Sequence, residues 1–408
     1  MRILLLNLYF PPDTSATAKV AESMSRALAQ SHEVTVLCGR PSYDPTERRP
    51  WKLWQTERIT TNGSSFTVVR VGSTAYSRMK MKLRILNYLT YAKLASHLAL
   101  FIPCDVILAM TDPPFNGISA AIIGMLKSKP VVYDIQDLYP DMAIAASIVT
   151  PGVIPRIWEY LHRWALRRAA RILVLGDDMR ARIIAKGVDP SKIFIVRNSV
   201  DVQSAGTPSP LLNSEVIRAI RANFRFVLLH AGNLGFYGAW DTLIAAVRQL
   251  QNDNVALVFV GDGAERSRLE SLAAGATNIR FLPFFPPADI PYVLAAPDAH
   301  IVTIKPGLQG VVAPSKMFGI LAAGKPIVAV APEETDVATL GARRGFAICA
   351  NPTNPDALAS AIRQLASDPA RLTAMGQSAS LAATRYSRAA EMQKLASIIS
   401  TIPPAART

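Results

Sequence analysis

The sequence predicts a protein of the α/β class, built from two doubly wound, Rossmann-like domains. Short apolar runs alternate with stretches of helical periodicity, a pattern typical of β–α–β units with a parallel sheet. The alternation runs through the first half of the chain, stops in a segment rich in serine, proline and asparagine, and then starts again. A length of 408 residues also favours two domains over one.

The first half begins with a continuous apolar run, residues 3–8, that ends near a proline pair. Such a run predicts a parallel strand buried on both faces. Further strands are expected at residues 33–38, 67–71, 105–110, 130–134, 171–175 and 193–196. Helices are expected at residues 18–30, 78–101, 118–126 and 156–169.

The second half repeats the pattern after a linker at residues 198–214. Strands are expected at residues 226–230, 255–260, 279–282, 299–303, 326–330 and 346–350. Helices are expected at residues 239–250, 316–323, 356–365, 369–375 and 389–400, with another ending near residue 273. Further helices are expected between the strands from residue 279 to residue 350. The predicted domains are residues 1–200 and 201–385, followed by a helix in residues 386–408 that packs back on the first domain. Ligands of such sheets bind at the carboxyl ends of the strands, so we expect a cleft between the domains.

The composition indicates a globular protein with an anionic partner. Half of the residues are hydrophobic and 18% are charged, which suffices for sizeable cores, and the formal net charge is +14. Phosphorylated small molecules, an anionic membrane and nucleic acid would all fit this charge. Nucleic acid is the weakest of the three, because no basic stripe with interleaved aromatic residues and no known nucleic-acid motif is present.

Residues 78–101 have a basic start followed by an apolar helical stretch, which suits the surface of an anionic membrane. A buried helix with a solvated beginning explains the same pattern equally well. No stretch is long and apolar enough for a transmembrane helix, and the N-terminal run lacks the features of a signal peptide. The three cysteines show no metal-ligand spacing and are expected to be reduced thiols. We therefore expect a cytoplasmic protein in peripheral contact with the cell membrane.

Residues 310–330 contain the strongest candidate for an anion site. Ser315 is expected to cap a helix by accepting a backbone hydrogen bond, and Gly324 to end that helix in a left-handed conformation. Lys316 lies in the first turn, where the helix dipole disfavours a cation unless an anion is bound nearby. The alternative is a solvated lysine at a helix start.

Two glycine loops follow strands of the second half. The first contains Gly232, Asn233 and Gly235, and the second spans residues 261–263. Each loop alone is a weak signal, but together with Lys316 they favour a site for a nucleoside diphosphate. The absence of a Walker A motif and of a dinucleotide-binding fingerprint argues against ATPases and dehydrogenases. His230 lies beside the first loop and is interpreted as a core residue.

Carboxylates cluster after the strand at residues 130–134. Asp134, Asp137 and Asp141 lie at or beyond its carboxyl end, with Gln136 among them. A carboxylate at this position can hold sugar hydroxyls or transfer a proton, and Asp137 is the preferred catalytic candidate. The alternative is that Asp137 caps the next turn. No group of residues has metal-ligand or triad spacing, so no metal is expected.

These motifs together resemble the retaining glycosyltransferases of family 4, which have the GT-B fold. Within that family, the chain is most similar to the WcaI/WbuB-like bacterial polysaccharide glycosyltransferases. The resemblance covers nearly the whole chain, and it is carried by YFPPDTSATAK, SHEVTVLCGRPSY, TDPP, IQDLYPD, AGNLGFYGAWDTLIAA, VGDGAERSRLE and APSKMFGILAAGKPIVA.

The resemblance implies an enzyme that needs no cofactor and transfers a sugar with retention at the anomeric carbon. The donor is expected to be a UDP-sugar, with a GDP-sugar second, and the acceptor a saccharide or a polyprenyl-diphosphate-linked sugar in O-antigen, capsule or exopolysaccharide synthesis. The implied donor-binding residues are Gly232, Asn233, Gly235, Ser315, Lys316 and Glu334. The implied acceptor-binding residues are Asp13, Thr14 and Asp112.

The chain departs from the family pattern at two places. Two glutamates are common in this family, and their positions align with Val311 and Gly319. A glycine inside a helix costs about 1 kcal/mol relative to alanine, so a close approach of backbone or ligand is expected at Gly319, unless Glu334 holds the ribose instead. Ser15 and Ala16 also stand where a glycine pair is usual.

The sequence leaves two other functions open. A nucleotide-sugar 2-epimerase on the same fold would need more acid and base residues than the chain offers. A non-catalytic nucleotide-sugar-binding or scaffold protein is consistent with the missing glutamates.

Overall fold

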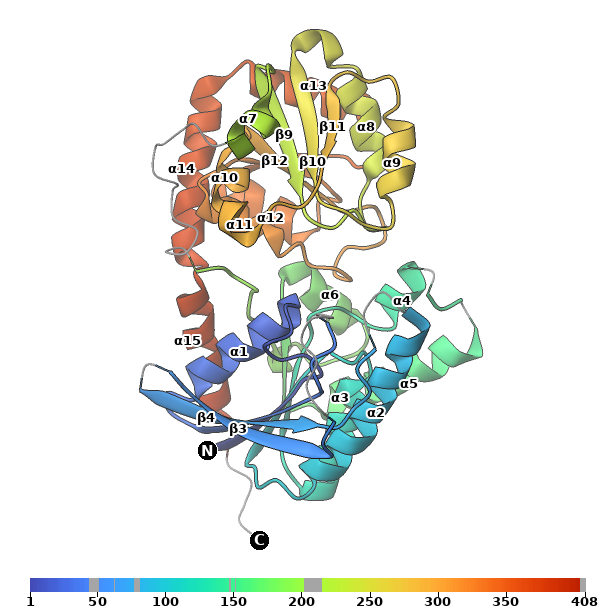
Figure 1. The fold of residues 1–408 in the computed structure, drawn as a ribbon, viewed down its shortest axis with the longest axis vertical. Coiled ribbons are helices and arrows are strands. Elements are labelled where there is room, and N and C mark those ends of the chain that lie inside the picture. The colour runs from blue at the N-terminus through green and yellow to red at the C-terminus, as the bar shows by residue number, and fades with distance from the viewer. Residues whose placement is uncertain are drawn as a thin grey trace. The chain divides into compact units, whose positions relative to one another are not determined.

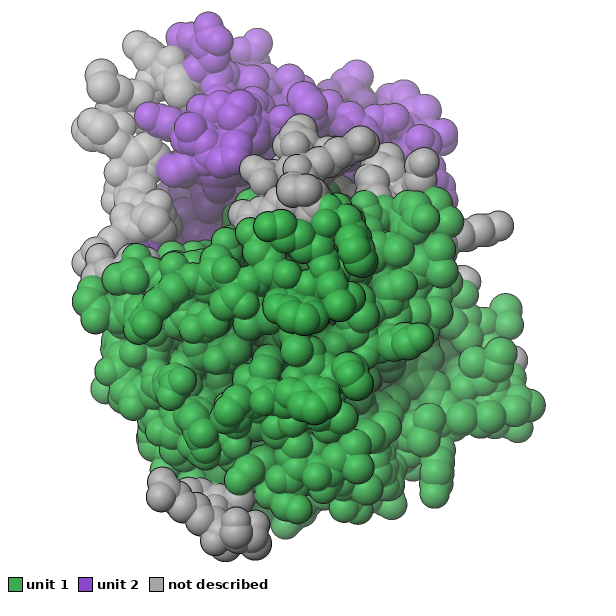
Figure 2. Space-filling model, turned by 60° about the horizontal axis from the view of Figure 1, so that its bottom comes forward, with its two compact units in different colours: residues 1–196, 392–408 green, residues 197–391 purple. Residues whose placement is uncertain are grey.

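The computed structural model describes residues 1–43, 51–61, 63–76, 81–146, 148–150, 152–201 and 215–403. The chain divides into two compact units (Figure 1 and Figure 2). Unit 1 comprises residues 1–196 and 392–408, and unit 2 comprises residues 197–391. The predicted α/β class with two parallel-sheet domains is confirmed.

Unit 1 contains an eight-stranded sheet with the order β3-β4-β2-β1-β5-β6-β7-β8. All neighbours pair in parallel except β3, which is antiparallel to β4 at the edge. The strands are β1 (Arg2–Leu6), β2 (Glu33–Cys38), β3 (Trp54–Thr61), β4 (Ser64–Val71), β5 (Val106–Met110), β6 (Val131–Asp134), β7 (Arg171–Val174) and β8 (Ile193–Ile195). The strand order reverses between β1 and β5, which is the position where doubly wound sheets bind ligands.

Helices cover both faces of this sheet. Side chains of successive strand residues point to opposite faces, so each strand contributes to a core on either side. Leu4 and Leu6 of β1 share a core with α2, α3, α5 and α6, whereas Ile3 and Leu5 share a core with α1 and α15. The helices of unit 1 are α1 (Ala16–Leu28), α2 (Met81–Ala99), α3 (Asn116–Lys127), α4 (Asp141–Ala145), α5 (Val153–Arg168), α6 (Asp177–Ala185) and the end of α15 (Arg388–Ser400).

Unit 2 contains a six-stranded, fully parallel sheet with the order β11-β10-β9-β12-β13-β14. Its strands are β9 (Phe226–Ala231), β10 (Val255–Val260), β11 (Ile279–Leu282), β12 (Ala299–Thr303), β13 (Ile327–Val330) and β14 (Ala347–Ala350). Its helices are α7 (Glu215–Arg221), α8 (Trp240–Arg248), α9 (Arg266–Leu272), α10 (Ile290–Ala295), α11 (Lys316–Ala322), α12 (Asp336–Arg344), α13 (Pro355–Ala366) and α14 (Pro369–Arg385). Here the strand order reverses between β9 and β12.

Most predicted elements are present within a few residues of the predicted bounds. The sequence did not predict β3, α4, α6 or α7, and it ended α14 ten residues early. β3 is a half-exposed edge strand with the polar sequence WQTERITT, so it lacks the apolar run used to recognise buried strands. The predicted linker lies mainly outside the described residues, as do residues 78–80 of the predicted helix at 78–101.

Candidate functional site

The reversal of strand order in unit 2 brings loops after β9, β10 and β12 to one edge of the sheet. β9 lies between β10 and β12, so its carboxyl end is flanked by both neighbouring strands. The predicted glycine loops follow β9 and β10, and Lys316 opens the helix that connects β12 with β13. The three sequence features are therefore brought together in one unit.

The two glycine loops pack directly against each other. The backbone N–H of Leu234 donates to the carbonyl of Asp262 at 2.9 Å. A Cβ atom on Gly261 would lie 2.0 Å from the carbonyl oxygen of Gly232, and one on Gly263 would lie 2.4 Å from that of Leu234. Gly232 and Gly261 also have positive φ angles of 130° and 142°. Backbone packing between the loops therefore explains why glycine is needed at these positions.

Aromatic side chains fix the first loop from within. The indole N–H of Trp240 donates to the carbonyl of Gly235 at 2.7 Å, and the hydroxyl of Tyr237 donates to the carbonyl of Asn233. Trp240 is buried against His230 with ring centroids 4.8 Å apart. Tyr237 and Trp240 were not predicted as residues of the site, although both follow Gly235 closely in the sequence. Asn233 itself is exposed, while Gly235 is buried.

Lys316 extends from α11 to the end of β9. Its ammonium group lies 2.9 Å from Nε2 of His230 and 5.8 Å from the ring centroid of Tyr237. A Cβ atom on Gly232 would lie 3.5 Å from Lys316 Nζ, so the amine borders the glycine loop. Burial lowers the pKa of Lys316 to about 7. The alternative of a solvated lysine at a helix start does not fit this environment.

His230 is fully buried, as expected for a core residue, but it also contacts Lys316. Burial first, and then the neighbouring Lys316 charge, lower the pKa of His230 well below its usual value. A neutral imidazole can accept a hydrogen bond from the lysine through Nε2. This hydrogen bond therefore holds the Lys316 amine beside the glycine loop, and its acceptor, His230, carries no negative charge.

One prediction for α11 is wrong, and one of the alternatives for Gly319 does not apply. Ser315 has helical backbone angles and its side chain makes no capping hydrogen bond, so it is an exposed residue before the helix instead of a cap. A Cβ atom on Gly319 would lie 3.7 Å from its nearest neighbour, Leu294 Cδ1, which is an ordinary contact, so a close backbone approach does not explain glycine there. A close ligand at Gly319, or a ribose held by Glu334 instead, stays a prediction. Gly324 has a φ of +65° after the helix, which confirms its predicted left-handed conformation.

The remaining positions of the family comparison have different environments. Val311 is buried at 1% exposure, whereas Glu334 is exposed in the segment between β13 and α12. Glu334 therefore remains a candidate for a ribose contact. The described residues include no group of three or more His, Cys, Asp or Glu side chains with metal-binding geometry.

In unit 1, Asp112 and Asp137 follow the neighbouring strands β5 and β6. The backbone N–H of Leu8, after β1, donates to the carbonyl of Asp112 at 2.8 Å, which ties this loop to the reversal point. Burial, and then the charge of Asp112, raise the pKa of Asp137 to about 7. Burial also raises the pKa of Asp112, although a hydrogen bond with Thr17 and the charge of Arg84 oppose the shift. In this Asp112–Asp137 pair, the charge of Asp112 therefore adds to burial in favouring the protonated form of Asp137.

The other carboxylates of this region have structural partners. Asp134 is completely buried and accepts a hydrogen bond from Gln136 at 2.5 Å. Asp141 forms ion pairs with Lys186 and Arg182. The helix after Asp137, α4, has no side-chain cap, so the alternative of Asp137 as a capping residue is wrong.

Of the predicted acceptor residues, Asp13 is buried at 3% exposure and Thr14 is exposed. One carboxylate oxygen of Asp13 accepts the backbone N–H groups of Ser42 and Tyr43 at 2.9 and 2.7 Å. This carboxylate therefore anchors the loop after β2. Ser15 caps α1 by accepting the N–H of Ala18 at 3.1 Å, which gives a structural reason for serine where family members have glycine.

One hydrogen-bonded cluster of side chains near Asp112 was not predicted from the sequence. The guanidinium of Arg84 donates to the hydroxyl groups of Tyr88 and Tyr9 at 2.6 and 3.2 Å. Burial raises the pKa values of both tyrosines, and the charge of Asp112 adds to the shift. Arg84 and Tyr88 are four residues apart on α2, so their contact could have been anticipated from helical spacing, but Tyr9 is brought in only by the fold.

Models of two protein domains match the chain. The description "Glycosyl transferase 4-like domain" applies to residues 15–199, and "Glycosyl transferases group 1" applies to residues 225–368. The chain is therefore a glycosyltransferase with a 4-like domain followed by a group 1 domain. The first match lies in unit 1 and contains the Asp112–Asp137 pair, and the second lies in unit 2 and contains the glycine loops with Lys316.

Two curated glycosyltransferases are related to the chain. WcaI of Escherichia coli (strain K12), named as a colanic acid biosynthesis glycosyl transferase, is 24% identical over 89% of this chain and 92% of its own length. WbjE of Pseudomonas aeruginosa, named as a glycosyltransferase, is 25% identical over 64% of this chain and 66% of its own length. Both relatives are thus named as glycosyltransferases, and only the name of WcaI includes a biosynthetic process.

Solved structures of GT-B glycosyltransferases have the same fold. HepE of Anabaena, solved in complex with UDP, has a TM-score of 0.67 at 18% identity, with 98% of this chain and all of that chain covered. WaaG, a glycosyltransferase involved in lipopolysaccharide biosynthesis, has a TM-score of 0.63 at 18% identity with the same coverage. The predicted GT-B fold class is therefore confirmed. No described helix combines the length and the apolar character required to cross a bilayer.

Proposed function

We propose that this glycosyltransferase moves a sugar from a UDP-sugar to a saccharide or polyprenyl-diphosphate-linked acceptor in the synthesis of a surface polysaccharide. Unit 2 binds the donor and unit 1 binds the acceptor. A GDP-sugar is the second choice of donor. Peripheral contact with the inner face of the cell membrane would give access to a lipid-linked acceptor.

The observation that carries the donor assignment is the position of Lys316 beside the loop at Gly232 and Asn233. Lys316 lies at the start of α11, and the two glycine loops meet at the end of β9. A diphosphate bound at this edge would accept hydrogen bonds from backbone N–H groups and from the ammonium of Lys316. These donors can stabilise the charge that develops on the leaving diphosphate without a metal. HepE, solved with UDP and with UDP-glucose, supports the choice of UDP.

The proposed reaction is a displacement with retention at the anomeric carbon. The acceptor hydroxyl oxygen forms a bond to that carbon on the face from which the diphosphate leaves, and the diphosphate takes the bonding electrons. Asp137 accepts the hydroxyl proton, a role suited to a carboxylate with a pKa of about 7. Asp13, Thr14 and Asp112 are the proposed acceptor-side residues, and Asn233, Gly235, Ser315 and Glu334 complete the proposed donor side.

The test is release of UDP from a panel of UDP-sugars in the presence of bacterial membrane lipid extract, with anomeric NMR of the product. Asp137→Asn should lower the rate by at least about 100-fold, because general base catalysis contributes 10²–10⁴-fold, while UDP still stabilises the variant against heat. Asp105→Asn, which changes a half-buried carboxylate that is paired with Arg2 before β5, should retain activity. Full activity of Asp137→Asn would contradict the catalytic role, and an inverted product would contradict retention.

A further inference from the structure

Asp137 lies in a loop that the sheet of unit 1 holds on its upstream side. The backbone N–H of Ile135 donates to the carbonyl of Leu173 on β7 at 2.9 Å. The backbone N–H of Gln136 donates to the hydroxyl of Thr111, which follows β5, at 3.1 Å. Segments on either side of β6 therefore fix the chain directly before Asp137.

The downstream side of the same loop has little local structure of its own. The chain continues into α4, which has five residues and no side-chain cap. Helices this short are marginal in isolation, because nucleation costs more than a few hydrogen bonds return. Leu138 packs in the core of unit 1. Two further contacts on this side come from α5 and α6.

The first contact is an aromatic stack between the loop and α5. The rings of Tyr139 and Trp158 are nearly parallel, with an interplanar angle of 12° and centroids 5.8 Å apart. Both side chains are half-buried. Aromatic rings stacked in this way attract each other beyond the area that they bury. The stack therefore ties the residue two positions after Asp137 to α5.

The second contact is an ion-pair cluster centred on Lys186, directly after α6. Its ammonium lies 2.8 Å from a carboxylate oxygen of Asp141, the first residue of α4, and 2.8 Å from one of Glu159 on α5. Arg182 on α6 also pairs with Asp141, at 3.0 Å. Only 7% of the Lys186 side chain is exposed, so solvent screens this cluster weakly. The ammonium therefore links the start of α4 with both α5 and α6.

Both contacts act on the same short stretch of chain. Tyr139 and Asp141 are the second and fourth residues after Asp137. A buried ion cluster adds little net stability, because the lost hydration offsets the attraction between the charges. The geometry that it imposes is well defined, however. A general base needs a defined position, because proton transfer requires it within hydrogen-bond reach of the acceptor hydroxyl.

We propose that Trp158 and Lys186 are positioning residues, which hold the loop so that Asp137 can accept the proton of the acceptor hydroxyl. This inference rests on the proposed function, in which Asp137 is the base. It extends the site to α5 and α6, neither of which the sequence connected with Asp137.

The test compares kcat and the KM for the UDP-sugar in the UDP-release assay. Trp158→Ala and Lys186→Met should each lower kcat about 10- to 100-fold, because a small misplacement of a reacting group costs up to about 100-fold. The KM for the donor should stay within about twofold, since the proposed donor site lies in unit 2. Trp158→Phe keeps a ring and Lys186→Arg keeps the charge, so each should recover most of the lost rate.

A double-mutant cycle with Asp137→Asn distinguishes positioning from a general loss of structure. In the Asp137→Asn background, Trp158→Ala and Lys186→Met should lower the rate no further, because residues that act as one unit have non-additive effects. A further fall by the same factor would overturn the proposal, as would full activity of both single variants. If Lys186→Met does not fold, the cycle with half-buried Trp158 still decides.

A matched lysine control lies in the same unit, at the other end of β6. Lys127 ends α3 and donates three hydrogen bonds of 2.7–2.9 Å, to the carbonyls of Ala99, Leu100 and Ile102. Lys127→Met therefore removes as many lysine hydrogen bonds as Lys186→Met, but before β6 instead of after it. The variant should keep the kcat of wild type. A loss equal to that of Lys186→Met would overturn the positioning role.

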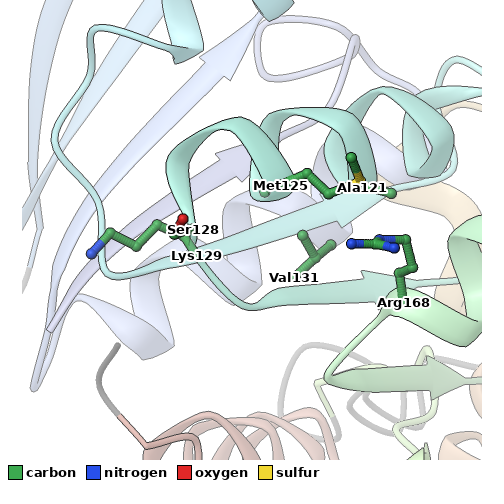
Figure 3. Close-up of a pocket in the computed structure, with 7 residues that line it drawn as sticks. Ala121, Met125, Ser128, Lys129, Val131 and Arg168 are labelled. Atoms are coloured by element: carbon green, nitrogen blue, oxygen red, sulfur yellow. The ribbon is translucent and has the colours of Figure 1, made fainter. Parts of the chain in front are cut away.

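The aromatic control is Trp164→Ala, also on α5. The ring of Trp164 lies 5.6 Å from the guanidinium carbon of Arg168. Figure 3 shows Arg168 beside Val131, the first residue of β6, whereas Asp137 follows the last. Trp164 therefore has its contact near the opposite end of the strand, and Trp164→Ala should keep its kcat. Equal losses in Trp164→Ala and Trp158→Ala would contradict a specific hold on the Asp137 loop.

The same proteins separate this inference from the proposed function. UDP should stabilise Trp158→Ala and Lys186→Met against heat as much as wild type. If Asp137→Asn is inactive while both positioning variants are fully active, only the positioning proposal is overturned. If Asp137→Asn is itself fully active, the proposed base is contradicted, and the positioning role is overturned with it.

Discussion

Lys316 is partly buried beside a neutral histidine, and its nearest polar partner carries no negative charge. Burial lowers the pKa of its amine to about 7, so the lysine is largely neutral above that pH in the free protein. A bound diphosphate would favour the protonated form and raise this pKa. Donor binding should therefore be linked to proton uptake.

We predict that UDP binding at pH 8 takes up about 0.9 proton, because a group with a pKa of 7 is only about one-tenth protonated at that pH. The affinity should fall as the pH rises above 7, since the free lysine must then be protonated for binding. Calorimetry in two buffers of different ionisation enthalpy measures the uptake. Lys316→Arg is the matched control, because arginine stays charged and should bind UDP with almost no proton uptake. Equal uptake by the two proteins would assign the proton to another group.

A second prediction concerns the contact between the glycine loops. Gly261→Ala should lower the free energy of unfolding by about 3 kcal/mol and weaken UDP binding, because its Cβ would meet the Gly232 carbonyl at 2.0 Å. Gly275→Ala is the control, since Gly275 has a positive φ of 79° but open space around its Cβ position. That variant should lose about 1 kcal/mol and keep its affinity. Denaturant unfolding and UDP titration distinguish the two results, and equal effects would contradict the loop-packing explanation.

The places of single residues in the fold were predicted best where they depend only on a neighbouring strand or helix in the sequence. Lys316, Gly232 and Asp137 follow recognisable strands, so their places at the sheet edges could be anticipated. The contacts of Lys316 with His230 and of Arg84 with Tyr9 join residues far apart in the sequence, and local patterns contain no information about them. Ser315 was mistaken for a cap because serine before a helix is a common cap, but its backbone is already helical.

At the scale of elements, the start of unit 2 is held by buried charges. Arg197 and Asp336, at the beginning of α12, pair at 3.0 Å with side-chain exposures of 7% and 8%. The backbone N–H of Arg197 donates to Glu391, and its guanidinium lies 5.2 Å from the ring of Tyr386. This group connects the first residue of unit 2 with α12 and with the segment leaving the unit.

We predict that Arg197→Ala lowers the free energy of unfolding by about 3–5 kcal/mol, because Asp336 would lose the partner of its buried charge. Arg363→Ala removes a comparable pair with Asp253, whose side chains are 51% and 33% exposed, and should cost less than about 1 kcal/mol. Chemical denaturation of both variants gives the comparison. Similar losses would show that burial does not determine the strength of the Arg197 pair.

Elements with strong apolar periodicity were predicted closely, and polar ones were not. The bounds of β10 match the expected residues because it is a fully apolar strand in the interior of a parallel sheet. β3 is stabilised by pairing with β4 over eight residues, and this pairing cannot be read from its own polar sequence. α14 continues past Met375 through small and polar residues that have helical propensity but little periodicity.

At the scale of the whole molecule, we propose that unit 2 alone binds the donor. The prediction is that saturating UDP slows amide hydrogen exchange at residues 232–237, 261–266 and 314–318, and leaves the loops at residues 111–115 and 135–139 unchanged. Binding to the folded state suppresses the local openings through which amides exchange. Hydrogen-exchange mass spectrometry resolves these segments. Protection confined to unit 1 would contradict the assignment.

The two-unit α/β architecture was predictable because the same alternating pattern occurs twice along the chain. The positive net charge indicated an anionic partner, but it did not reveal where the charge lies. Only the structure shows that α5 presents isoleucine and arginine to solvent, because the sequence pattern of that helix also fits burial in a core.

The most direct test of the central claim is a thermal-shift comparison of UDP, GDP, ADP and CMP on wild type and Lys316→Ala. A ligand at about 100 times its dissociation constant stabilises the folded state by roughly 2.7 kcal/mol, which is readily measured as a rise in melting temperature. We expect the largest rise in melting temperature with UDP, and we expect Lys316→Ala to lose that rise. No rise with any nucleotide, or an equal rise in the variant, would contradict a donor site at the glycine loops and Lys316.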